Sequence, residues 1–114
     1  MPVSSPSSPS QRDLTRRYKE SLPPMGVYVI RNVLSGRVFV RGSLNLDGAM
    51  NRCRFELARG QHRDRALMDE WARHGAENFR FEIIDTIRKR EEPGFDYAAE
   101  LASMLALWTE ELAS

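Results

Sequence analysis

The chain has 114 residues, enough for one compact domain, and its 17 lysines and arginines against 16 aspartates and glutamates give a formal net charge of +1. This balance argues against a uniformly basic nucleic-acid clamp, but it is compatible with a local basic patch. No apolar run approaches the roughly 20 residues that span a bilayer, and the N-terminal stretch lacks the apolar segment of a secretory signal. The single cysteine, Cys53, excludes an internal disulfide. We therefore expect a cytoplasmic protein without a membrane partner.

The N-terminal part of the chain differs in composition from the rest. Residues 1–10 are rich in proline and serine and are expected to be disordered, because they offer little apolar surface to bury. Residues 11–22 are basic and carry apolar side chains at the spacing of a short helix, which the following proline pair ends. We therefore divide the chain into a disordered, basic extension over 1–24 and a folded domain over 25–114.

Two runs of β-branched and aromatic residues open the predicted domain. Residues 26–32 and 37–43 each indicate a strand. The intervening "NVLSGR" supplies a turn, with Gly36 available for a positive φ. The short connection predicts that the two strands form an antiparallel hairpin.

Two helices are predicted to follow the hairpin. The first runs from about Leu46 or Asp47 to Arg59 and ends before a glycine. Its apolar residues recur at helical spacing and predict one buried stripe, made of Leu46, Met50, Cys53 and Leu57. The second helix covers about 64–74, is also followed by a glycine, and turns an apolar face inward that consists of Leu67, Met68 and Trp71.

One more strand and one more helix complete the pattern. The segment "FRFEIIDTI" predicts a strand over 79–87. After a charged turn, Asp96 is a plausible N-cap for a last helix that reaches about Leu112 with one continuous apolar face. The order ββααβα predicts an α+β domain with a small three-stranded antiparallel sheet flanked by helices.

These elements resemble a known family. "GVY" at 26–28 resembles the first tripeptide of the GIY-YIG endonuclease domain, and "FVR" at 39–41 stands where the second, YIG, is expected. "GSLNL" at 42–46 resembles the loop that follows, and "NRCRFELARGQHRDRALMDEWARHGAENFRFEIIDTI" at 51–87 resembles the helix, loop, helix and strand of small bacterial members. The resemblance extends over about 26–112 and implies the GIY-YIG fold.

The resemblance also implies a chemistry, which can be compared residue by residue. Proteins of this family cleave phosphodiester bonds with one divalent metal, usually magnesium. They use the tyrosines of both motifs, an arginine on the first helix and a metal-binding glutamate on the last helix. Tyr28 fills the first tyrosine position, whereas the other three positions are taken by Phe39, Ala49 and Leu105.

The replacements predict a site that has lost its chemistry. A phenylalanine lacks the phenolic oxygen, a methyl group offers no charge to a phosphate, and a leucine has no oxygen for magnesium. Loss of one preorganised charge-stabilising donor typically lowers a rate about a hundredfold to a thousandfold. We therefore expect a carbon-lined cleft between Tyr28, Phe39, Arg41, Ala49 and Leu105, no cofactor and negligible hydrolysis. Phe39 is interpreted as a plain core aromatic and Leu105 as part of the apolar face of its helix, and a structural role for Tyr28 as a packed strand residue also stays open.

Cations near this cleft are the candidates for binding nucleic acid. Arg41 replaces the glycine of the second motif and shares a strand face with Phe39, where it can either contact a phosphate or extend to solvent. The other candidates form a short basic segment, namely Arg52, Arg59, His62, Arg63 and Arg65. The alternative is an ordinary solvated helix face with intrahelical ion pairs, and for His62 a hydrogen bond that stabilises its loop.

Three hypotheses about function follow from these observations. The first is a catalytically impaired GIY-YIG domain that binds nucleic acid through its basic residues. The second is a protein-interaction or structural module on the same fold, which the apolar Leu44 and Phe55 permit. The third is an active DNA endonuclease dependent on a divalent metal, magnesium being required only in this case. The sequence leaves the nucleic acid, the protein partner and the oligomeric state open.

Overall fold

The computed structural model describes residues 22–112, so the predicted extension and short helix lie outside the described residues except at their end. The elements follow in the order β1 (Gly26–Asn32), β2 (Val38–Ser43), α2 (Leu46–Ala58), α3 (Arg65–His74), η1 (Ala76–Asn78), β3 (Phe79–Thr86) and α4 (Tyr97–Leu112). The predicted α+β class and the order ββααβα are confirmed. The short 3₁₀ helix η1 was not predicted from the sequence. None of the helices within 22–112 has the length and apolarity needed to cross a membrane.

The three strands form one antiparallel sheet in the order β2-β1-β3. In the β1–β2 pair, Tyr28 lies opposite Arg41 and Ile30 lies opposite Phe39. Because side chains alternate along a strand, these four residues share one face of the sheet. The pairing of β1 with β3 is interrupted by a shift between Val27 and Tyr28, which is typical of a β-bulge.

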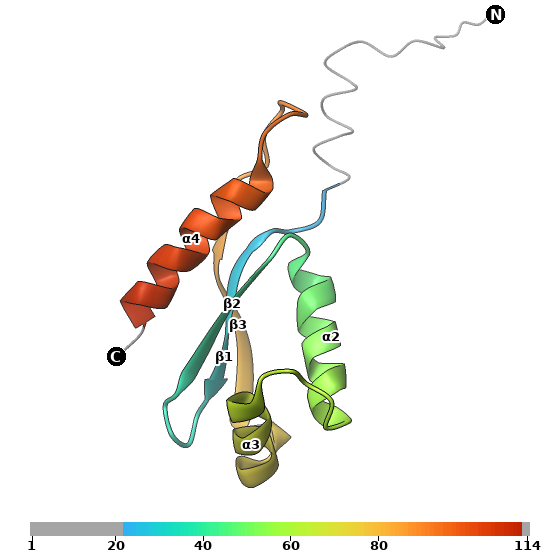
Figure 1. Ribbon diagram of the computed structural model, residues 1–114, viewed down its shortest axis with the longest axis vertical. Coiled ribbons are helices and arrows are strands. Elements are labelled where there is room, and N and C mark those ends of the chain that lie inside the picture. Colours follow the sequence, from blue (N-terminus) through green and yellow to red (C-terminus); the bar gives the residue numbers. More distant parts are fainter. Residues whose placement is uncertain (1–21, 113–114) are drawn as a thin grey trace, which may run out of the picture.

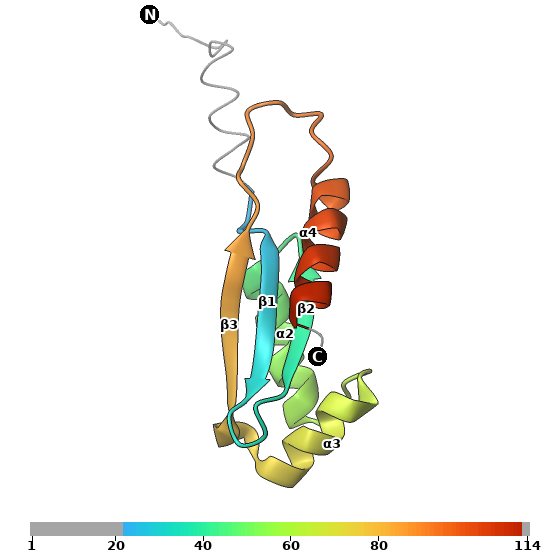
Figure 2. The same ribbon diagram turned by 90° about the vertical axis from the view of Figure 1, so that its left-hand side faces the viewer.

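Helices cover both faces of the sheet. Figure 1 shows α4 on one side of the strands and α2 with α3 on the other. Figure 2 shows the strands side by side, with α4 in front of the sheet near β2 and α2 behind it. Because β1 is the central strand and is covered on both faces, every residue from Val27 to Ile30 is buried.

Two apolar cores hold these layers together. The larger lies between the sheet and the pair α2 and α3, and consists of Tyr28, Ile30, Phe39, Leu46, Cys53, Leu57, Leu67 and Phe79. It contains the stripe predicted for the first helix, with Met50 only partly buried. The smaller core consists of Met25, Ile87 and Tyr97, and Leu101 and Met104 of α4 pack against it.

The helices begin where polar side chains satisfy their first backbone amides. The side chain of Asn45 accepts a hydrogen bond from the Gly48 N–H at 3.1 Å, at the start of α2. Asp64 does the same for Leu67 at 3.1 Å before α3, and Asp96 for Ala99 at 3.0 Å before α4. These three contacts are N-cap interactions, and the one at Asp96 was predicted from the sequence.

The glycine that opens β1 is required by the close approach of β3. A Cβ atom on Gly26 would lie 2.1 Å from the backbone oxygen of Asp85, and its φ of 155° disfavours other residues. Any side chain here would push the two strands apart. The first residue of the "GVY" motif is therefore explained by packing of the sheet.

Candidate functional site

An open pocket of about 880 Å³ lies on the face of the sheet that carries α2 and α3. It is formed by one residue of β1, the end of β2, the first three turns of α2 and the loop before α3. Its lining residues are Tyr28, Arg41, Gly42, Ser43, Asn45, Gly48, Ala49, Arg52, Cys53, Glu56, His62, Arg63 and Asp64.

Tyr28 forms the floor of this pocket. Its side chain is only 5% exposed, and its ring stacks on that of Phe81 with 6.5 Å between the centroids. Burial is the main cause that raises the pKa of the Tyr28 phenol, to which the neighbouring Cys53 also contributes. Burial likewise raises the pKa of the Cys53 thiol to about 11. Both groups are therefore protonated at neutral pH and neither is an activated nucleophile.

The expected cleft is only partly present, and two of its five residues require correction. Tyr28, Arg41 and Ala49 line the pocket, but Phe39 and Leu105 do not. Phe39 is buried in the larger core, with the Arg37 guanidinium carbon 4.7 Å from its ring centroid. The position that resembles the second catalytic tyrosine is therefore a core position in this chain, as the interpretation of Phe39 as a core aromatic predicted.

Leu105 lies on the opposite face of the sheet. A Cβ atom on Gly42 would be 3.1 Å from Leu101 Cδ1 and 3.4 Å from Leu105 Cδ2, so the absence of a side chain at Gly42 lets α4 pack closely on β2. The next residue toward the hairpin, Arg41, points to the pocket instead. Sequence reasoning placed Leu105 in the cleft because it considered the family position without the alternation of β2.

The expectation of a carbon-lined site is also wrong, because two carboxylates line the pocket. Glu56 Oε2 forms an ion pair with Arg52 Nε at 3.1 Å, one turn earlier on α2. Asp64 forms an ion pair with Arg41 and accepts the N-cap hydrogen bond from Leu67. Each carboxylate is therefore already bonded to an arginine.

The environment of Asp64 determines its charge. Burial alone would raise the pKa of its carboxyl group, but the hydrogen bond from the Leu67 N–H and the charge of Arg41 outweigh burial and lower this pKa. Asp64 is therefore ionised at neutral pH and holds the Arg41 guanidinium, which also donates to the Val40 carbonyl at 2.9 Å. Arg41 consequently joins β2 to the N-cap of α3, a contact that was not predicted from the sequence.

The donor set of the pocket does not fit a divalent metal. No group of three or more histidine, cysteine, aspartate or glutamate side chains with metal-binding geometry occurs within residues 22–112. Magnesium prefers oxygen ligands, and the two carboxylates of the pocket are engaged by arginines. The pocket therefore offers no free set of oxygen ligands for a metal-dependent step.

The structure gathers four of the six predicted nucleic-acid-binding residues around the pocket, namely Arg41, Arg52, His62 and Arg63. Arg59 and Arg65 are exposed but do not line it. Three arginines against two carboxylates give the pocket a formal charge of +1 with His62 neutral. Arg63 has no ion-pair partner within the described part of the chain, and the Arg52 side chain is 75% exposed, so both can reach a ligand.

His62 is held by its own loop. Its Nδ1 accepts a hydrogen bond from the Asp64 backbone N–H at 3.0 Å, which is the loop contact that the sequence analysis considered. Because the Nδ1 lone pair is used, the neutral ring carries its hydrogen on Nε2. His62 Nε2 is therefore available to donate a hydrogen bond to a ligand of the pocket.

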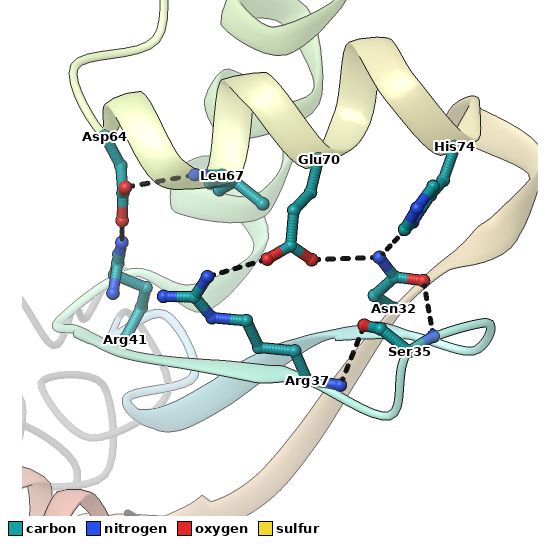
Figure 3. Close-up of polar contacts among 8 residues, drawn as sticks. All are labelled: Asn32, Ser35, Arg37, Arg41, Asp64, Leu67, Glu70 and His74. Carbon is teal, nitrogen blue, oxygen red and sulfur yellow. Dashed lines mark hydrogen bonds and ion pairs between the residues drawn. The ribbon is translucent and has the colours of Figure 1, made fainter.

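Next to the pocket, a polar network that the sequence analysis missed fastens α3 to the β1–β2 hairpin (Figure 3). The fully buried Asn32 side chain donates to Glu70 Oε1 at 2.9 Å and to His74 Nδ1 at 2.7 Å. Its Oδ1 accepts from the backbone N–H of Leu34 at 3.0 Å and of Ser35 at 3.3 Å. The only sequence signal was an asparagine at the start of a turn, which is typical of side chains that bond to nearby backbone groups.

Comparison with known proteins gives matches in structure but not in sequence. No protein-family model matches the chain, and no curated protein matches it. The catalytic domain of the homing endonuclease I-TevI matches with a TM-score of 0.66 and 26% identity over 79% of this chain and 89% of that one. A glutamate-to-alanine mutant of the same catalytic domain matches with a TM-score of 0.66 and 23% identity, over 80% of this chain and 86% of that one.

These matches define the class of the fold. The catalytic domain of I-TevI is a GIY-YIG homing endonuclease domain, and this chain has the same nuclease-like arrangement of a three-stranded antiparallel sheet with helices on both faces. The chain therefore has a GIY-YIG-like fold, as its motifs predicted.

Proposed function

We propose that this protein is a nucleic-acid-binding domain that uses the pocket of a GIY-YIG-like fold to hold the phosphodiester backbone without cleaving it. The observation that carries the proposal is the meeting of Arg52, His62 and Arg63 around one open pocket. Cations and hydrogen-bond donors that converge on a hollow surface are suited to phosphate oxygens. The structural neighbours are endonuclease domains, which makes a nucleic acid the natural ligand class.

The individual residues have different roles in this proposal. Arg63 offers a guanidinium with no competing carboxylate among residues 22–112, and His62 donates from Nε2. Arg52 exchanges its exposed ion pair with Glu56 for a phosphate, since exposed pairs contribute little and phosphate accepts two bonds from a guanidinium. Arg41 stays bonded to Asp64 and acts as a positioning residue.

Absence of cleavage follows from what the pocket residues are. The floor carries one buried, protonated phenol, and Ala49 offers only a methyl group beside it. The available carboxylates neutralise arginines instead of gathering around a metal. In this proposal the fold binds nucleic acid without cleaving it.

The test measures affinity for a fluorescein-labelled oligonucleotide by anisotropy at several salt concentrations. With the two cations Arg52 and Arg63 on phosphates, the logarithm of affinity falls against the logarithm of salt with a slope of about −1.4 to −1.8. The double variant Arg52→Ala, Arg63→Ala is expected to weaken binding at least about tenfold and to remove most of this salt dependence. Arg73→Ala, which removes an exposed arginine of α3 outside the pocket, is the matched control and should have little effect.

A gain in affinity is expected when the competing carboxylate is removed. Glu56→Gln releases Arg52 and raises the pocket charge by one unit, so binding should tighten several-fold, about 1 kcal/mol. Affinity independent of salt, or an equal loss in the Arg73→Ala control, would contradict the proposed function. Nicking of plasmid DNA with magnesium or manganese that disappears in Tyr28→Phe would contradict the absence of cleavage.

A further inference from the structure

Next to the pocket, one large aromatic side chain is exposed to solvent. Phe55 of α2 is 58% exposed, although the core stripe of the same helix is formed by other residues. The guanidinium carbon of Arg59 lies 5.0 Å from the Phe55 ring centroid. The ring therefore makes little contribution to the core and has a cation stacked on it.

Phe55 is adjacent to the pocket on the helix surface. Residues three and four apart on a helix are neighbours, with about 5–6 Å between their Cβ atoms. Arg52, which lines the pocket, precedes Phe55 by three residues, and Arg59 follows it by four. The three residues therefore follow one another along the helix surface from the pocket rim, and Phe55 lies between Arg52 and Arg59 in this row.

We infer that Phe55 is a stacking platform for an unpaired base whose neighbouring phosphate is held by Arg52 at the pocket, so that the ligand is single-stranded or locally unpaired nucleic acid. This inference rests on the proposed function and narrows its ligand class. Aromatic rings and guanidinium planes are the groups on which splayed bases stack. In a continuous duplex, by contrast, the faces of a base are covered by its neighbours in the stack.

The surroundings of Phe55 favour a nucleic acid over an apolar protein surface. A protein that covered the ring would also have to cover Arg52 and Arg59, whose charges complement phosphates flanking a stacked base. The most exposed apolar residue of the other face, Leu107, is 70% exposed but has Glu110 and Glu111 as its helical neighbours. Among the large apolar side chains that are exposed within residues 22–112, Phe55 is the one aromatic ring, and a guanidinium lies over it.

The experiment compares Phe55→Leu with the matched Phe55→Tyr variant, which retains a ring. Each is titrated into a fluorescein-labelled oligothymidylate, the same strand with abasic sites, and a duplex. Phe55→Leu is expected to weaken binding of the intact single strand about 5- to 100-fold, the effect of losing one stacked base. Binding of the abasic strand and the duplex should change less than about twofold, and Phe55→Tyr should bind like the wild type.

The outcomes separate this inference from the proposed function. If the wild type binds and the Arg52→Ala, Arg63→Ala variant does not, the proposed function holds. In that case the inference alone is overturned if Phe55→Leu weakens binding of all three probes equally, or changes the binding of none of them. If the wild type binds none of the probes, both fall. A protein partner whose binding depends on Phe55, without any affinity for single strands, would also overturn it. The melting temperature of Phe55→Leu should be unchanged, because the side chain is exposed. A loss of affinity in this variant is then not caused by a loss of folded protein.

Discussion

The two faces of the sheet are built in different ways. On one face, α2 and α3 enclose an open pocket in which three arginines, two carboxylates, a histidine and a tyrosine meet. On the other, α4 packs on β1 and β2 through apolar side chains, and its clearest polar contact to the sheet joins Trp108 Nε1 to Asp85 at 2.9 Å. The two helix positions that the GIY-YIG resemblance assigns to catalysis, Ala49 of α2 and Leu105 of α4, therefore lie on opposite faces of the sheet.

The same difference applies to how the helices are attached. The α3 helix is joined to the hairpin by Arg37–Glu70 at 2.7 Å, by Arg41–Asp64 and by the bonds of Asn32 (Figure 3). Polar contacts require specific geometry at both partners, whereas the packing of α4 depends on shape. We expect the pocket face to be sensitive to loss of single polar groups, and the α4 face to be sensitive to any charge that enters it.

The largest effect is expected for Asn32→Ala. Asn32 is fully buried and its side chain makes four hydrogen bonds, so its loss leaves groups of the turn and of α3 without partners. The free energy of unfolding should fall by about 2–4 kcal/mol in urea titrations. Asn51→Ala, at an exposed position of α2, should change it by less than about 0.5 kcal/mol. Equal effects of the two variants would show that the polar network does not fasten α3.

A smaller loss is expected when a carboxylate enters the apolar face. Leu105→Glu places a charge against Gly42 and Leu101 and should lower the free energy of unfolding by about 1–3 kcal/mol. The matched Leu107→Glu, at a position that is 70% exposed, should change it by less than about 0.5 kcal/mol. If manganese instead raised the free energy of unfolding of Leu105→Glu, the new carboxylate would have to bind the ion together with residues of the pocket. That result would contradict the assignment of Leu105 to the opposite face of the sheet.

Residue pattern alone was sufficient for most of the fold. Strand β1 and the last residue of each of the helices α3 and α4 were predicted as found, because alternating and helical apolar spacing and the cap at Asp96 are local signals. The candidate site was less predictable. Whether Leu105 faces the pocket depends on the side of β2 against which α4 packs. The ion pair of Arg41 with Asp64, the N-cap of α3, and the bonds of Asn32 to Glu70 and His74 join residues distant in the sequence. Contacts of this kind leave no periodic signal.

The smallest expected effect concerns the ion pair between Arg41 and Asp64, which both line the pocket, and it depends on pH. The folded state lowers the pKa of Asp64 below its ordinary value of 3.8, so the stabilisation is complete above that pH and is lost as the pH falls through the lower, folded-state pKa. Asp64→Asn keeps an N-cap acceptor but loses the pair with Arg41. Its free energy of unfolding should be lower than that of the wild type by about 1 kcal/mol at neutral pH, and the difference should shrink in acid. Asp69→Asn, which alters an exposed carboxylate of α3, is the control. If the difference in free energy of unfolding between the wild type and Asp64→Asn stayed constant with pH, the charge of Asp64 would not stabilise the fold.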